Sequence, residues 1–250
     1  MSAYLTGRAG KTLGVLGGMG PLASAEFVRT VYRLHSGPDQ SHPRLLLDSD
    51  PAFPDRTEAI RTGRTAELVD RMDTRLRELL ARGADRLVIA CYTAHHVLDE
   101  IDPVVRASIV SLVDTALAAL ATTSGRFLLL CTEGTRQARV FQRAPGWAAV
   151  SDRVVEPDAA DQHRLHQLIY RMKHYGPLPL EAVAEVDRLL ARYGCVGTVL
   201  GCTEFHLVSE EFTARYGVSA TVDALRHIAV GAFWARTAGF APLLASGAAA

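Results

Sequence analysis

Two stretches of the chain repeat one pattern: LLARGADRLVIACYT at residues 79–93 and LLARYGCVGTVLGCTE at residues 189–204. Each reads as the end of a helix, a glycine, a short apolar strand, a cysteine and a threonine, with eight positions from glycine to cysteine in both copies. Upstream, LGVLGGMGP at 13–21 and FLLLCTEGT at 127–135 form a second matched pair in the same order. Two ordered matches predict that the chain holds two related α/β units.

The apolar runs indicate parallel sheets. Runs such as RLLLD at 44–48 are continuous rather than alternating, which is typical of strands covered by helices on both faces. We therefore predict an α/β fold of two pseudo-symmetric lobes, each a mostly parallel sheet flanked by helices. The first lobe is expected to hold residues 1–117 and 218–250 and the second 118–217, with the active site in the cleft between them. Helices are expected near 21–35, 65–82, 160–175, 179–193 and 221–237.

The composition argues against several classes of function. The chain has 250 residues and a formal net charge of zero, so no long-range field favours nucleic acid or an anionic membrane surface. No apolar run reaches the ~18 residues of a spanning helix, and the first residues lack the apolar core of a secretory signal. We expect a soluble cytoplasmic protein that binds a small molecule, with a disordered tail, SGAAA, at 246–250.

The cysteines that end the two repeated strands are the main candidates for chemistry. Parallel strands present ligands beyond their carboxyl ends, so Cys91 and Cys202 are expected on opposite sides of one substrate carbon. One thiolate would remove a proton while the other thiol supplies one from the opposite face. The helix after each cysteine is expected to lower the pKa of its thiol. The alternative is a pair of buried structural thiols, which is the role we expect for Cys131 and Cys195.

Two other kinds of site compete for these residues. Cys91 with His95 and Cys202 with His206 form two C-x3-H pairs, a donor set that suits zinc if each pair lies on a helix. The GGMGP turn also fits G-x-G-x-x-A after a strand, a pattern of dinucleotide binding in which Asp48 would contact a ribose. The dinucleotide hypothesis leaves both cysteine–threonine ends unexplained. We expect neither a metal nor a cofactor.

Five short motifs follow one another along the chain: GGMGP at 17–21, PDRT at 54–57, CYTAH at 91–95, TEGT at 132–135 and GCTE at 201–204. Together they resemble the aspartate/glutamate racemase family, cofactor-independent enzymes with two pseudo-symmetric α/β lobes. The resemblance covers nearly the whole chain and implies a racemase or epimerase that needs no pyridoxal phosphate; members of the family are often homodimers. Consistent with this, only two lysines, Lys11 and Lys173, could form a Schiff base.

The resemblance also implies roles for single residues. Cys91 and Cys202 would be the catalytic acid–base pair. Arg56 and Lys173 would receive a side-chain carboxylate, the alternatives being a loop salt bridge for the arginine and a solvated helix end for the lysine. Thr93, Thr132 and Thr203, with nearby backbone N–H groups, would cradle the substrate carboxylate. The other residues expected at the substrate are Met19, Tyr92, Thr135 and Glu204.

Two positions depart from the family pattern. Tyr92 and Asp50 stand where most members have asparagine. An ionised aspartate only accepts hydrogen bonds, and it repels an acidic substrate unless an arginine neutralises it. We therefore hypothesise that the substrate is related to aspartate or glutamate without being simply either one. An isomerase or decarboxylase of small carboxylates, and an inactive amino-acid-binding relative with Tyr92 in its pocket, stay open. His95 either tunes Cys91 or is an interior histidine.

Overall fold

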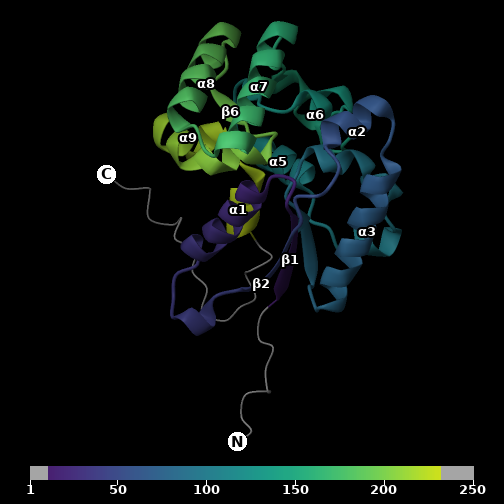
Figure 1. The fold of residues 1–250 in the computed structure, drawn as a ribbon. Helices are drawn as coiled ribbons and strands as arrows, with labels where there is room; N and C mark the ends of the chain where they lie inside the picture. Colours follow the sequence, from purple (N-terminus) through teal and green to yellow (C-terminus); the bar gives the residue numbers. More distant parts are fainter. Residues whose placement is uncertain (1–10, 232–250) are drawn as a thin grey trace, which may run out of the picture.

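The computed structural model describes residues 11–231. Strands and helices alternate along this part of the chain, and the strands form two separate sheets (Figure 1). Figure 1 shows α7, α8 and α9 gathered at one end of the molecule and β1, β2 and α3 at the other. The tail expected at 246–250, and the end of the helix expected at 221–237, lie outside the described residues.

The first sheet has three parallel strands in the order β2-β1-β3. Its central strand is fully buried along its length, as its continuous apolar sequence requires. A single parallel bridge between Leu87 and Ile109 continues the sheet beyond β3. The strands are β1 Thr12–Gly17, β2 Arg44–Ser49 and β3 Arg86–Ile89; the helices of this half are α1 Pro21–Leu34, α2 Arg56–Thr62, α3 Ala66–Ala81, the 3₁₀ helix η2 Thr93–Glu100, α4 Pro103–Arg106 and α5 Leu112–Ala121.

The second sheet has four parallel strands in the order β5-β4-β6-β7. Central strands β4 and β6 are buried at every residue. The strands are β4 Phe127–Leu129, β5 Val154–Val155, β6 Gly197–Val199 and β7 Thr221–Val222; the accompanying helices are α6 Glu133–Gln137, α7 Ala159–Tyr175, α8 Pro179–Tyr193, the 3₁₀ helix η5 Thr203–Val208, α9 Ser209–Tyr216 and α10 Ala224–Val230.

The returning segment links the two lobes. The lobe boundary expected at residue 218 would put the following strand in the first lobe, but β7 pairs with β6 in the second sheet. Helix α10, directly after β7, packs against α1 and α5 of the first half. Asp223 lies between β7 and α10, and its side chain caps α10 by accepting from Leu225 N and Arg226 N.

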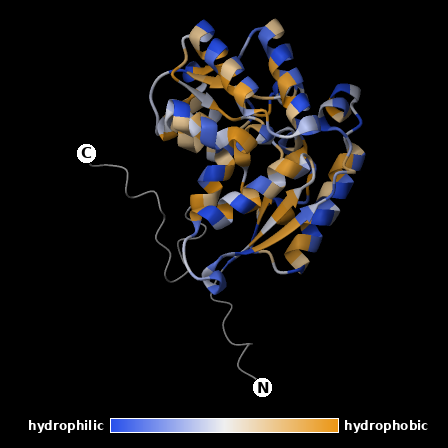
Figure 2. Ribbon diagram, turned by 60° about the vertical axis from the view of Figure 1, so that its left-hand side comes forward, coloured by the Kyte–Doolittle hydropathy of each residue, from blue (hydrophilic) through white to orange (hydrophobic). Residues whose placement is uncertain are grey.

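Three buried clusters hold the fold together. One joins the lobes, with residues such as Leu13 and Phe27 packed in the same cluster as Phe127 and Leu129. The second lies between the first sheet and α3, and the third lies between the second sheet, α7 and α8. Figure 2 shows the matching pattern, with apolar colour on the strands and polar colour along the outer faces of the helices. A shared apolar core fixes the strand ends of both lobes relative to one another.

Candidate active site

The chain segments after β3 and β6 meet at a hydrogen bond between the lobes. Thr203 Oγ1 donates to the carbonyl oxygen of Ala90 at 3.2 Å. Ala90 immediately precedes Cys91, and Thr203 immediately follows Cys202. Each of the two cysteines is 5% exposed. The structure therefore brings both cysteines to one nearly closed junction between the lobes.

Lys173, on α7, interacts electrostatically with Glu204 and with both thiols. Burial by itself lowers the pKa of this ammonium, but Glu204, Cys202 and Cys91 together raise it above its ordinary value. Its Nζ lies 3.7 Å from Glu204 Oε1, and its side chain is 21% exposed. The lysine is thus not at a solvated helix end, which was the alternative reading of its place in the sequence. The ammonium therefore acts electrostatically on both thiols.

Glu204 connects Cys202 to that ammonium. Cys202 Sγ donates a hydrogen bond to Glu204 Oε2 at 2.8 Å, and the other carboxylate oxygen faces Lys173. Glu204 is 2% exposed. Burial, followed by the charge of Glu204, raises the pKa of the Cys202 thiol well above its ordinary value. The expectation of a lowered pKa is wrong for this cysteine, because burial and the carboxylate outweigh the opposing effect of Lys173.

Three threonine hydroxyls from the two lobes form a closed triangle. Thr93 Oγ1 lies 3.1 Å from Thr132 Oγ1 and 2.8 Å from Thr135 Oγ1, and the latter two atoms are 3.0 Å apart. Thr132 also caps α6, since its Oγ1 accepts from the N–H of Thr135. All three residues are buried. Because hydroxyl hydrogens rotate freely, the triangle is a set of donors that can turn toward an anion.

Arg56 lies buried at the first position of α2. Its guanidinium donates to the carbonyls of Met19 at 2.7 Å and Pro54 at 2.8 Å, with a longer contact to Phe53 at 3.4 Å. Its Nε is buried and has no hydrogen-bond partner within residues 11–231. Within the same residues, no carboxylate lies at ion-pair distance from this arginine. The salt bridge considered as an alternative is therefore not found.

The aspartates of the same loop have other partners. Asp50 Oδ2 lies 3.0 Å from Arg71 Nη2, and the pKa of Asp50 is lowered by the Ala52 N–H and by that arginine. Asp55 caps α2 and also accepts from Tyr170 Oη at 2.9 Å. The carboxylate of Asp50, one of the two departures from the family pattern, is thus neutralised by arginine.

The GGMGP turn places glycines against two other segments. Gly18 has φ +84°, and a Cβ there would clash with the backbone of Asp50. Gly20 directly precedes α1, and a Cβ there would collide with Glu204 Oε1. Met19, between them, is 1% exposed and packs in the same cluster as Cys91. The turn therefore needs glycine so that backbone can approach the acid of the site.

Tyr92 and His95 face the core behind Cys91. The Tyr92 ring stacks on Phe141 at 5.4 Å between centroids and is 3% exposed as a residue. His95 Nε2 accepts from Leu112 N at 3.1 Å, so its Nδ1 carries the hydrogen that bonds Cys91 O at 2.9 Å. Burial lowers the pKa of His95 to about 4. His95 therefore holds the backbone of Cys91 as a neutral ring, and Tyr92 fills core space.

The two competing kinds of site find no support here. Both ring nitrogens of His206 are in hydrogen bonds, to Asp223 Oδ2 at 2.6 Å and to Thr30 Oγ1 at 3.1 Å. Both ring nitrogens of His95 are in hydrogen bonds to backbone groups. Within residues 11–231, no three histidine, cysteine or acidic side chains are placed to hold a metal ion. Asp48, the acid of the dinucleotide hypothesis, lies 3.8 Å from Arg75.

Two further residues of the site were not predicted from the sequence. Tyr170 lies under Lys173, with Nζ 5.1 Å from the ring centroid. Thr57 lies so close to Gly134 that a Cβ on the glycine would come within 2.6 Å of Thr57 Oγ1. The i,i+3 spacing of Tyr170 and Lys173 on α7 was an available signal. The glycine of TEGT, opposite PDRT, was another, since it permits close approach of the two loops.

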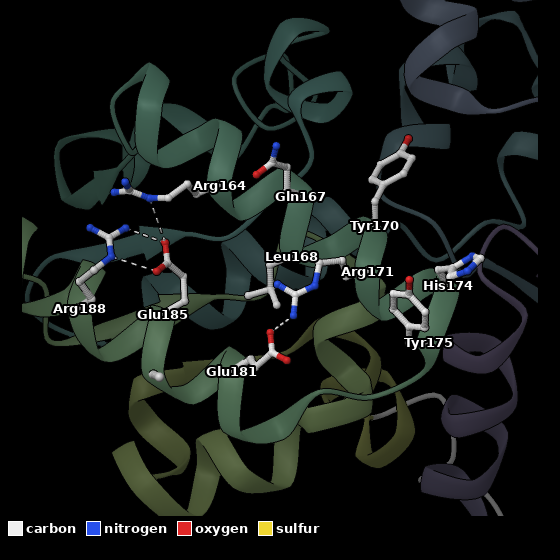
Figure 3. A pocket seen from close by; sticks show the side chains of 11 residues that line it. Arg164, Gln167, Leu168, Tyr170, Arg171, His174, Tyr175, Glu181, Glu185 and Arg188 are labelled. Carbon is white, nitrogen blue, oxygen red and sulfur yellow. Dashed lines mark hydrogen bonds and ion pairs between the residues drawn. The ribbon is translucent and has the colours of Figure 1, made fainter.

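A separate groove of about 870 Å³ lies on the outer side of α7 and α8 (Figure 3). Figure 3 shows Arg171 paired with Glu181 and Arg188 paired with Glu185. Tyr170 is the residue that this groove shares with the surroundings of Lys173. The groove is lined by Arg164, Gln167, Leu168, Tyr170, Arg171, His174, Tyr175, Glu181, Ala184, Glu185 and Arg188.

The fold and the positions of Cys91 and Cys202 define a class of two-lobed α/β proteins with a cysteine from each lobe at their junction. The chain belongs to the Asp/Glu/Hydantoin racemase family, whose model matches residues 16–229. This confirms the resemblance seen in the five motifs and makes the protein a member of a family of isomerases. Within residues 11–231, no helix is long and apolar enough to cross a membrane.

Solved structures of racemases share the fold. The chain is similar to the aspartate racemase of Picrophilus torridus, at 24% identity and a TM-score of 0.76, over 93% of this chain and 96% of that one. An aspartate racemase homologue from Pyrococcus horikoshii matches at 20% identity and a TM-score of 0.63, over 86% and 94%. The glutamate racemase of Campylobacter jejuni matches at 15% identity and a TM-score of 0.55, over 87% and 82%. These likenesses confirm the predicted two-lobed α/β fold.

Proposed function

We propose that this protein racemises or epimerises an amino acid at its α-carbon by a two-thiol mechanism without pyridoxal phosphate. Cys91 takes the α-proton from one enantiomer while Cys202 delivers a proton to the opposite face, and the roles reverse for the other enantiomer. The observation that carries this proposal is the hydrogen bond from Thr203 to Ala90. It supports an arrangement in which two thiols from different lobes flank one carbon.

The difficult step is the loss of a weakly acidic proton beside a carboxylate. The site must stabilise negative charge on the α-carbon and its carboxylate as the C–H bond breaks. The hydroxyls of Thr93, Thr132 and Thr135, together with Thr203, are the donors we propose for that carboxylate. Their burial supports this role, since a donor is worth more where water is excluded.

We propose aspartate, glutamate or a related amino acid as the substrate. The Nε of Arg56 is a buried donor without a partner, and Lys173 supplies a second cation. The pairing of Asp50 with Arg71 removes the repulsion on which our hypothesis of a substrate other than aspartate or glutamate depended. Tyr92 is not retained among the proposed substrate contacts, because its ring packs on Phe141.

We also propose that the protein acts as a homodimer in the cytoplasm. The dimer follows from the family resemblance alone. The reduced compartment is supported by the chemistry, because Cys91 and Cys202 must both stay as thiols. The four cysteines, all within residues 11–231, form no disulfide.

Deuterium incorporation tests this function and the substrate together. The protein is incubated in deuterated water with each amino acid in both enantiomeric forms, and the α-position is read by mass spectrometry and chiral chromatography. We expect incorporation with inversion for one or a few substrates. Binding without incorporation would instead mean an inactive relative, and a product of changed composition would mean a decarboxylase; either result overturns the proposal.

Single-cysteine variants sharpen the test. Cys91→Ser and Cys202→Ser should each lower the racemisation rate by at least about 100-fold, the usual loss on removal of an acid–base group. Each variant should still exchange deuterium into the one enantiomer whose α-hydrogen faces the remaining thiol. Cys195→Ser changes a half-exposed thiol outside the junction. It should catalyse racemisation at the parental rate and serves as the control.

A further inference from the structure

We infer that Glu204 is a positioning residue that keeps the proton of the resting enzyme on Cys202, so that Cys202 is the acid and Cys91 the base when substrate arrives. This inference rests on the proposed racemase function for its role in turnover. Its structural basis is independent of any substrate: Cys202 Sγ donates to Glu204 Oε2 at 2.8 Å in a site where the acid is 2% exposed.

The charge around Cys202 explains why the proton stays on it. Ionising this thiol would place a thiolate at hydrogen-bond distance from a buried carboxylate, and two like charges that close repel strongly in a poorly solvated site. Lys173 offsets only part of this repulsion, because it approaches the other oxygen of Glu204, at 3.7 Å. Tyr92 of the first lobe also interacts electrostatically with Cys202, and Cys91 and Arg56 act on Lys173.

The two cysteines are therefore unequal although their sequence motifs match. Cys91 is followed two positions later by Thr93, whereas Cys202 is followed two positions later by Glu204. The structure gives the Cys91 backbone a neutral partner, His95, through its carbonyl, and it gives the Cys202 sulfur a carboxylate. Of the two repeated α/β units, only the second thus places a carboxylate against its thiol, and this favours the protonated form of Cys202.

One proton leaves the substrate and another joins it in each turnover. The Cys91 thiolate takes the α-hydrogen as a proton, and the electron pair of the broken C–H bond stays on the substrate. The S–H bond of Cys202 breaks and its proton forms the new C–H bond on the opposite face. Cys91 is left as a thiol and Cys202 as a thiolate beside Glu204. Because that thiolate is disfavoured, exchange with solvent returns the enzyme to its resting form.

A thiolate titration of the free enzyme tests this inference without a substrate. The ultraviolet absorbance of thiolate is followed against pH, and the Cys202 component is obtained by subtracting the titration of Cys202→Ser. Glu204→Gln keeps the shape of the side chain and removes its charge. We expect it to move the Cys202 midpoint down by about one to three pH units, the usual effect of a charge at this distance. Glu204→Asp, which keeps the charge but draws it back, should give a smaller shift in the same direction.

Glu133→Gln is the matched control. Glu133 likewise follows a strand end of the second lobe, but its carboxylate bonds His163 at 3.0 Å and no thiol. It should leave the Cys202 midpoint where the parent has it. An unchanged midpoint in Glu204→Gln, or an equal shift in Glu133→Gln, overturns the inference.

The kinetic readout separates this inference from the proposed function. The two enantiomers of a racemised substrate have equal free energies, so kcat/KM is the same in both directions. Its pH profile is expected to show one alkaline limb. That limb should move down in Glu204→Gln by the same amount as the thiolate midpoint. If no amino acid is racemised, the proposed function fails while the titration still decides the role of Glu204. A merely structural role would lower activity without moving the limb.

Discussion

The structure predicts that acidification destabilises the protein through His95. This ring is buried and neutral, donating from Nδ1 to Cys91 O and accepting at Nε2 from Leu112 N. Its pKa is about 4 in the folded protein, against an ordinary value of 6.5, because burial disfavours the charged ring. A protonated ring could no longer accept from Leu112, so the folded state resists protonation.

The direction and size of this change in the free energy of unfolding follow from proton linkage. Below a pH of about 6.5 the unfolded chain binds a proton at this histidine, whereas the folded protein does so only near pH 4. The unfolded state therefore gains protons first, and the free energy of unfolding falls as the pH falls through this window. Between about pH 7 and about pH 5 this one group costs about 2 kcal/mol. The loss is complete, at about 3 kcal/mol, once the pH is below the folded pKa.

Urea unfolding at the two pH values measures this effect. The free energy of unfolding is compared between the parent and His95→Gln, which keeps a donor and an acceptor but cannot take up a proton. The variant should be less stable at neutral pH and should lose about 2 kcal/mol less on acidification. His174→Gln, which changes an exposed histidine, should behave as the parent does. The same pH dependence in the parent and His95→Gln would refute the reasoning.

Three further outcomes are expected. Gly20→Ala should lower kcat/KM at least about tenfold while the fold persists, because its Cβ would displace the Glu204 carboxylate; Gly146→Ala, whose Cβ meets only ordinary contacts, should leave the kinetics unchanged. Thr135→Val should destabilise the protein by about 1–3 kcal/mol in thermal unfolding and raise KM, with Thr135→Ser restoring both. Cys131, whose pKa burial raises to about 12, should resist alkylation in the folded protein at neutral pH, as read by peptide mass spectrometry.

The sequence was sufficient for the fold because the decisive signals were local. Continuous apolar runs before Cys91 and Cys202 could be read as buried parallel strands, and the equal spacing in the two repeats predicted their equivalent ends. The expected helix at 65–82 and the observed α3, Ala66–Ala81, agree because its apolar residues recur at helical spacing. Each of these signals lies within one element.

The details of the site could not be read in the same way. The bond from Cys202 to Glu204 depends on side-chain rotamers in a short 3₁₀ helix, and matching motifs suggested equal thiols. Tyr92 packs on Phe141, which comes 49 positions later in the chain, so its turn toward the core has no local signature. The pairing of β7 with β6 is likewise a long-range choice, made between two short strands.

The threonine triangle affects the affinity that such an enzyme would have for its substrate and product. Its hydroxyls hydrogen-bond one another in this structure. The carboxylate that we propose they bind would therefore replace one set of hydrogen bonds by another, with little net gain in free energy. A racemase must release the enantiomer of the substrate that it bound, and both carry the same carboxylate. Because the hydroxyls already hydrogen-bond one another, they would add little to the affinity for either enantiomer, and charge would be the main source of attraction.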